Sequence, residues 1–152
     1  MDHNYGLLTA LSAIAAGTIF ASAVSERASG LPAANRKARL DLAAFQMETD
    51  RPIDAVPLLE SLARRDPASA YLALKLAAAR FAAHDYREAA QEYRRLLARH
   101  ADCPPAEYNL ALALRELGRS DEARPLLQSF VEKYASLLPE TCAQAELLIQ
   151  HL

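Results

Sequence analysis

The chain has 152 residues, a length that allows one domain with short appendages. Hydrophobic residues make up 52% of it, and its many alanines and leucines favour helix because they lose little entropy in that conformation. The net charge of −2 argues against nucleic-acid binding, which needs a basic surface, and the two cysteines are too few for a disulfide framework or a zinc site.

The first element in chain order is residues 4–25, which contain no charged side chain. About 20 predominantly apolar residues suffice for a helix to span a bilayer. We therefore interpret the stretch as a retained transmembrane helix. A cleaved signal peptide ending at residues 21–23 (Ala-Ser-Ala) is the alternative, although residues 1–4 lack the positive charge that signal peptides carry. A buried helix of a soluble domain is a third interpretation, for which the stretch is long.

Basic side chains follow this span and none except a histidine precedes it. Because basic residues stay on the cytoplasmic side of a membrane, the rest of the chain is expected in the cytoplasm. Residues 26–34 form a short linker with Gly30 and Pro32, which would keep the following domain near the bilayer. The richness in alanine and arginine is typical of a high-GC bacterium, so the expected location is a bacterial inner membrane, with the periplasm as the alternative.

Small residues recur at four-residue spacing in two sets along the predicted span, first Gly6 and Ala10 and then Ala13, Gly17 and Ala21. Such a strip lets a second helix approach closely within a bilayer. An alanine-rich span also produces this spacing by chance. If the strip is a real helix contact, the protein is a subunit of a membrane complex.

Residues 35–137 contain three tandem copies of one 34-residue unit, at 36–69, 70–103 and 104–137. A fixed period of this length indicates stacked helical repeats. The register rests on residues that coincide when the copies are superposed: Leu42-Ala43, Leu76-Ala77 and Leu110-Ala111; Ala55, Ala89 and Ala123, each preceded by an acid; and Leu59, Tyr93 and Leu127.

This pattern resembles the tetratricopeptide repeat (TPR) family. The resemblance implies an all-α, right-handed superhelix of about three helix-turn-helix repeats, here with a C-terminal capping helix and one preceding transmembrane helix. The chain departs from the family pattern where a first-helix tyrosine is replaced by Gln46, Arg80 and Leu114, and the chain contains no tryptophan.

Each copy should form two helices, at 33–49 and 53–65, 68–83 and 86–99, and 105–117 and 121–134. Gly118 should adopt the left-handed conformation that ends a helix. Pro57 and Pro125 occupy the same repeat position, so their helices should start late or bend slightly. Residues 138–152 should form a cap that packs through Leu147, Leu148 and Ala143, because a repeat array needs a closed end. A partner-binding tail is the alternative.

No catalytic motif was found. The sequence lacks H-E-x-x-H, a glycine-rich phosphate loop and C-x-x-C, and its four histidines are scattered. We therefore expect no enzymatic activity, no cofactor and no metal.

The family resemblance implies a concave groove lined by the first helix of each copy. The residues at its groove positions are Lys37, Leu40 and Met47 in copy one, Tyr71, Leu74, Lys75 and Phe81 in copy two, and Tyr108, Asn109, Leu112 and Arg115 in copy three. Some relatives clamp a C-terminal carboxylate there. Leu40 and Ala44 replace two of the polar groups needed, so that activity is not expected. Phe81 and Leu112 could instead fill space between repeats.

The most consistent hypothesis is a membrane-anchored scaffold or adaptor, an accessory or assembly subunit of a multi-protein membrane complex. Its partners would be other protein subunits, bound as a peptide or helix in the groove. The alternative is a secreted or periplasmic TPR binding module from which the N-terminal segment has been removed.

Overall fold

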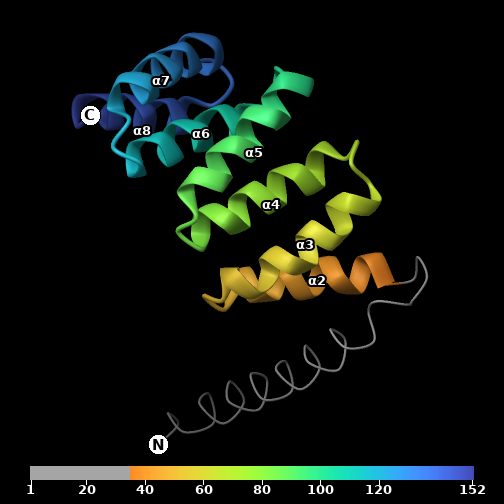
Figure 1. The fold of residues 1–152 in the computed structure, drawn as a ribbon. Coiled ribbons are helices and arrows are strands. Elements are labelled where there is room, and N and C mark those ends of the chain that lie inside the picture. Colours follow the sequence, from red (N-terminus) through yellow and green to blue (C-terminus); the bar gives the residue numbers. More distant parts are fainter. Residues whose placement is uncertain (1–34) are drawn as a thin grey trace, which may run out of the picture. The chain divides into compact units, whose positions relative to one another are not determined.

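The computed structural model describes residues 35–152, and within this range the chain forms seven helices (Figure 1). Their bounds are α2 Asn35–Glu48, α3 Pro52–Arg65, α4 Ala70–Ala82, α5 Tyr86–Arg99, α6 Pro104–Glu116, α7 Ser120–Tyr134 and α8 Pro139–Gln150. Residues 43–152 form one compact unit, whose packing is described below. The described residues therefore have the expected all-α order, a series of helix pairs followed by a single helix.

Within this unit each helix packs on the helices next to it in the chain, from α3 to α8 (Figure 1). Helix α4 also contacts α6, which places the first helices of copies two and three side by side. The second helices α3 and α5 each contact α4, on which both pack. The array consequently has one surface made by first helices and another made by second helices.

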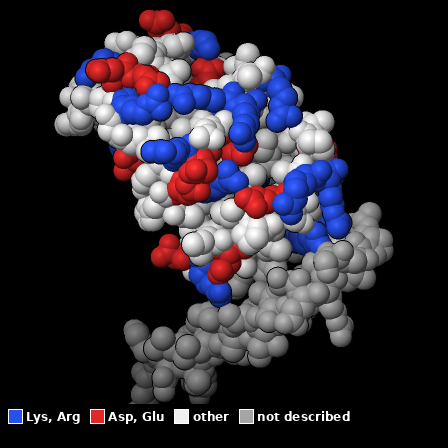
Figure 2. Space-filling view, in the orientation of Figure 1, with Lys and Arg blue, Asp and Glu red and all other residues white. Residues whose placement is uncertain are grey.

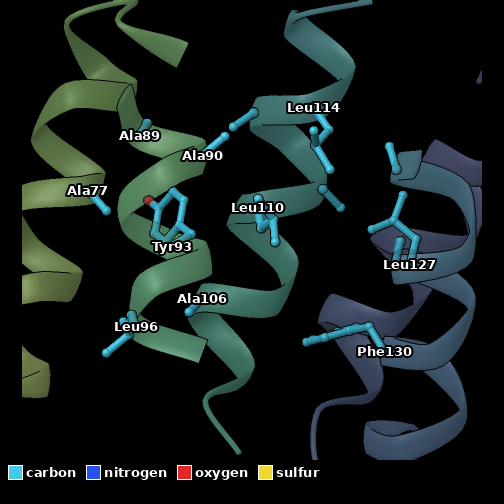
Figure 3. Close-up of a cluster of buried hydrophobic side chains, with 14 of the residues drawn as sticks. Ala77, Ala89, Ala90, Tyr93, Leu96, Ala106, Leu110, Leu114, Leu127 and Phe130 are labelled. Carbon is cyan, nitrogen blue, oxygen red and sulfur yellow. The ribbon is translucent and has the colours of Figure 1, made fainter. Parts of the chain in front are cut away.

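Alanines at repeated positions allow this close packing. Ala55, Ala89 and Ala123 are all fully buried, as expected from their coincidence in the three copies. The bulky residue four positions later is buried as well, in the form of Leu59, Tyr93 or Leu127 (Figure 3 shows the cluster around Tyr93). A side chain larger than alanine where two helices cross would hold them apart. This explains why alanine recurs at the same position of each copy.

The turn inside each copy has the same backbone geometry. Gly118 has the expected positive φ of 72°, and Asp50 and His84 adopt φ of 57° and 62° at the equivalent positions. The N–H of the next residue donates to a carbonyl in the last turn of the preceding helix, as from Arg119 to Leu114 at 2.8 Å. This arrangement satisfies a carbonyl that the helix end leaves free.

Of the two effects expected of proline, a late start of the second helices was wrong, and a slight bend stays a prediction. Helix α3 begins at Pro52 and α7 at Ser120, so that Pro57 and Pro125 lie inside them. Both prolines are exposed. Each lies only about one and a half turns from the helix start, where the carbonyl that loses its partner can be hydrated instead.

The terminal helix α8 packs on α7, but not through all the residues expected. Leu148 packs against the core, whereas Leu147 is 58% exposed and Ala143 is also exposed. The buried positions are Cys142 and Ala145. The helix is thus rotated about its axis relative to the sequence-based assignment, because two small residues let it lie closer to α7 than a leucine would.

Within residues 35–152 no helix combines the length and apolar character needed to cross a bilayer. The predicted span at 4–25, with its small-residue strip from Gly6 to Ala21, and the linker at 26–34 lie outside the described residues.

Candidate functional site: two surfaces of the helical repeats

Helix α4 presents part of the predicted groove. Tyr71 is 55% exposed, and Lys75 places its Nζ atom 5.6 Å from the centre of the Tyr71 ring. A cation at this distance from an aromatic face is attracted to the ring, so the two side chains form one exposed aromatic and basic feature. Leu74 and Phe81 are half-buried and pack against the core.

Helix α6 presents the neighbouring row. Leu112 is half-buried and Arg115 is exposed, where Arg115 forms an ion pair with the adjacent Glu116. Tyr108 packs its ring 5.5 Å from the Phe130 ring, centre to centre. Because α4 contacts α6, Leu112 and Arg115 lie on the helix next to the Tyr71 and Lys75 pair.

Two of the predicted groove residues have clear structural roles. Phe81 makes an edge-on contact with Tyr86, with ring centres 5.2 Å apart, which links α4 to the start of α5. Asn109 hydrogen bonds to the phenol of Tyr93; burial raises the pKa of Tyr93, and this hydrogen bond partly opposes the shift. Phe81 and Asn109 therefore help to hold the helices together, whatever else they contact.

The remaining predicted groove residues belong to α2. Lys37 is exposed, and Leu40 and Met47 are half-buried. Residues 35–42 lie outside the compact unit that contains α4 and α6. The structure thus brings together the groove residues of copies two and three.

A second feature, which the sequence analysis did not identify, is a cleft of about 440 Å³ formed by α3, α4 and α5. Arg80 lines it and donates from Nη2 to Glu60 Oε1 at 2.6 Å and from Nη1 to Glu92 Oε1 at 3.3 Å. Arg64 and Arg99 line the same cleft and are exposed. The sequence feature that could have indicated this cleft is Arg80, which the sequence analysis noted only as a replacement of the family tyrosine.

The corresponding junction of copies two and three contains a polar cluster. Glu107 is buried and accepts hydrogen bonds from Lys133 Nζ at 3.2 Å and from the Tyr134 hydroxyl at 3.0 Å. The same hydroxyl lies 2.7 Å from Asp102 Oδ1. Burial, reinforced by the two acceptor carboxylates, raises the pKa of Tyr134, which stays protonated and can donate.

The described part of the chain was also searched for metal ligands and for paired cysteines. No group of three His, Cys, Asp or Glu side chains there could hold a metal ion. Cys103 and Cys142 are free thiols, the second of them buried.

Comparison with known proteins agrees with this architecture. The sequence model described as tetratricopeptide repeat matches residues 80–136. No curated protein sequence matches the chain.

Solved structures share the fold at low sequence identity. The Yersinia enterocolitica type III secretion translocator chaperone SycD is 20% identical, with a TM-score of 0.71 over 83% of this chain and 88% of that one. SycD in complex with a peptide of the translocator YopD is also 20% identical, with a TM-score of 0.72 over 79% and 93%.

PcrH in complex with the chaperone binding region of PopD is 22% identical, with a TM-score of 0.69 over 80% and 93% of the two chains. These values establish similarity of fold. The described helices thus have an all-α, TPR-like fold, and residues 80–136 carry the sequence signature of the tetratricopeptide repeat.

Proposed function

We propose that the chain is a non-enzymatic adaptor that binds a segment of a partner protein on the surface formed by its first helices. The observation that carries this proposal is the exposed row on α4 and α6, where Tyr71, Lys75 and Arg115 face solvent without being needed for the core. Tyrosine and arginine are common anchors of protein interfaces. The likeness to SycD and PcrH, both solved with a segment of another protein, supports the proposal.

The chemistry of this surface favours a segment with an apolar side and at least one acidic group. Leu112 offers a half-buried apolar side chain on α6, the helix next to the one that carries Tyr71. Lys75 on α4 and Arg115 on α6 supply positively charged side chains, the second of them paired with Glu116. An amphipathic helix or an extended strand of a partner would cover such a surface.

Replacing both Tyr71 and Arg115 by alanine should lower recovery of bound partners by about tenfold or more, because interface anchors each contribute about 2 kcal/mol or more. The measurement is affinity purification of the tagged full chain after gentle detergent extraction, with bound proteins quantified by mass spectrometry. Both side chains are exposed and lie outside the buried core, so the variant should keep the circular dichroism spectrum of the native chain.

The matched control is Leu147→Ala, which removes a similarly exposed side chain from α8. It should leave partner recovery unchanged. Undiminished recovery with the double variant would exclude the first-helix surface as the binding site.

The finer form of the proposal is an accessory or assembly subunit of a bacterial membrane complex, held at the inner membrane by residues 4–25 with the repeats in the cytoplasm. It is supported by the uncharged length of that stretch and by the basic residues that follow it. The alternative is a periplasmic binding module without this segment.

The full chain should sediment with membranes and be released by detergent but not by high salt, since salt weakens only electrostatic attachment. A variant that begins at residue 26 should remain in the supernatant. The mass of the native protein provides the decisive readout: a chain shortened at residues 21–23 would contradict anchoring and favour the periplasmic module.

A further inference from the structure

The charged lining of the cleft between α3 and α5 is not required by the repeat fold. Arg80 and Glu92 in this junction correspond to Leu114 and Leu126 one repeat later. Leu114 is 1% exposed and Leu126 packs against the core, so leucine fills the same space in the next junction. Two charged side chains at such positions, beside an open cleft, indicate a role other than packing.

The cleft differs from its counterpart at one further repeat position. Ala73 lines it where copy three has Glu107, whose carboxylate binds Lys133 and Tyr134. An alanine methyl cannot make these contacts. The two junctions therefore differ at three repeat positions, 73, 80 and 92 in copy two.

The ion network at the base of the cleft pairs two of the three acidic side chains that line it, Glu60 and Glu92. Arg80 pairs with both Glu60 and Glu92, and Glu92 Oε1 also accepts from Arg95 at 3.0 Å. The two carboxylates are thus each neutralised by at least one guanidinium. The other charged side chains that line the cleft are Arg64, Arg99 and Asp66, so arginines outnumber acids among them.

At the rim, hydrogen-bond donors are in excess. Arg99 donates from Nη1 to the Pro67 carbonyl at 2.7 Å, which fixes its guanidinium while leaving its other N–H groups available. Arg64 lines the same cleft and is exposed, and no side chain among residues 35–152 forms an ion pair with it. A guanidinium held in place beside a second one matches the geometry of a carboxylate.

The cleft opens away from the surface of first helices. With about 3.6 residues per helical turn, Ala73, Leu76 and Arg80 lie on one side of α4. Tyr71, Lys75 and Ala78 lie on the opposite side. Occupation of the cleft consequently would not compete directly with a segment bound along Tyr71 and Lys75. Figure 2 shows Lys and Arg side chains interspersed with Asp and Glu side chains over one face of the described helices.

We propose that the cleft formed by α3, α4 and α5 is a second binding site, which takes an acidic side chain of a partner protein between Arg64 and Arg99. The arginines supply paired N–H donors, and Ala63 and Ala73 supply an apolar wall for the methylene groups of the bound glutamate or aspartate. The chain would then hold two segments, of one partner or of two, on opposite sides of α4.

The test uses the full chain and a labelled, N-acetylated peptide in which glutamate alternates with alanine, at physiological ionic strength. The double variant Arg64→Ala/Arg99→Ala should bind this peptide about tenfold more weakly than the native chain, because charge-assisted hydrogen bonds to both guanidiniums are lost. The same peptide with glutamine in place of glutamate should bind the native chain as weakly as the variant does.

Matched control variants distinguish peptide binding in the cleft from nonspecific electrostatic attraction to exposed arginines. Arg65→Ala and Arg87→Ala remove exposed arginines from the same two helices, neither of which lines the cleft, and should leave affinity nearly unchanged. In methyl NMR spectra the glutamate peptide should shift Ala63 and Ala73 but not Ala78.

Equal weakening by both pairs of variants would overturn the proposal, as would unchanged affinity of the Arg64→Ala/Arg99→Ala chain. Shifts of Ala63 and Ala73 with inorganic phosphate but not with the peptide would overturn a protein ligand in favour of a small anion.

Discussion

Replacing Phe130 by alanine should destabilise the repeats by about 3–5 kcal/mol, the cost typical of removing a large buried aromatic ring. Phe130 is 1% exposed. Its ring centre lies 5.0 Å from that of Tyr134 and 5.5 Å from that of Tyr108, so one ring joins α7 to α6. Loss of the ring would leave a cavity that two further aromatic side chains line and cannot easily fill.

Urea unfolding followed by circular dichroism at 222 nm measures this effect. The control is Ile53→Ala, which removes an apolar side chain that is 70% exposed and should change the free energy of unfolding by no more than about 0.5 kcal/mol. A loss below about 1 kcal/mol for Phe130→Ala would mean that α7 and α8 can collapse into the space, and that the aromatic cluster is not the centre of the core.

Replacing Arg80 by alanine should cost about 1–3 kcal/mol, because Glu60 and Glu92 would both lose a cationic partner. The side chains of Arg80, Glu60 and Glu92 are 17%, 35% and 16% exposed. Water reaches the pair with Glu60 in part, so the cost should be lower than that of breaking a fully buried pair.

The double variant Arg80→Leu/Glu92→Leu should behave differently. It reproduces Leu114 and Leu126 of copy three, and replacing a buried ion pair by apolar side chains is often neutral or stabilising by about 1–4 kcal/mol. Urea unfolding of the two variants gives the comparison. A double variant less stable than Arg80→Ala would show that copy two cannot accept the apolar packing of copy three, and that the charges serve the fold.

Much of the order of the helices could be predicted from the sequence, because the same residue pattern occurs in three copies. Ala55, Ala89 and Ala123 coincide in all three copies, and each is buried for the same reason, the close approach of two helices. The left-handed turn could be predicted at Gly118, because glycine adopts a positive φ without steric cost. At Asp50 and His84 the same geometry is adopted by residues that tolerate it less well, and only the period reveals it.

Side-chain direction was harder to predict than helix position. Leu147 was expected to be buried because it is apolar, yet small residues on the opposite side of α8 allow closer packing, and Leu147 faces solvent. Asn109 was assigned to the groove by family position, and its bond to Tyr93 depends on the spacing of α5 and α6.

The cleft could not have been predicted because it depends on contacts between residues far apart in the chain. Arg80 lies 20 residues from Glu60 and 12 from Glu92, with no shared motif. A single charged substitution at a family position is visible in the sequence. Whether its neighbours neutralise it, and whether they leave open space, is determined by the packing of three helices.

The succession of contacts from α3 to α8 has a kinetic consequence. Since each helix packs mainly on the ones adjacent in sequence, contact order is low, and little loop-closure entropy opposes the first contacts. Folding can nucleate in any copy and spread along the array. Helix α8, whose main neighbour is α7 alone, would be the first to detach from this end and the last to dock, so that local opening begins at the C-terminus long before the whole chain unfolds.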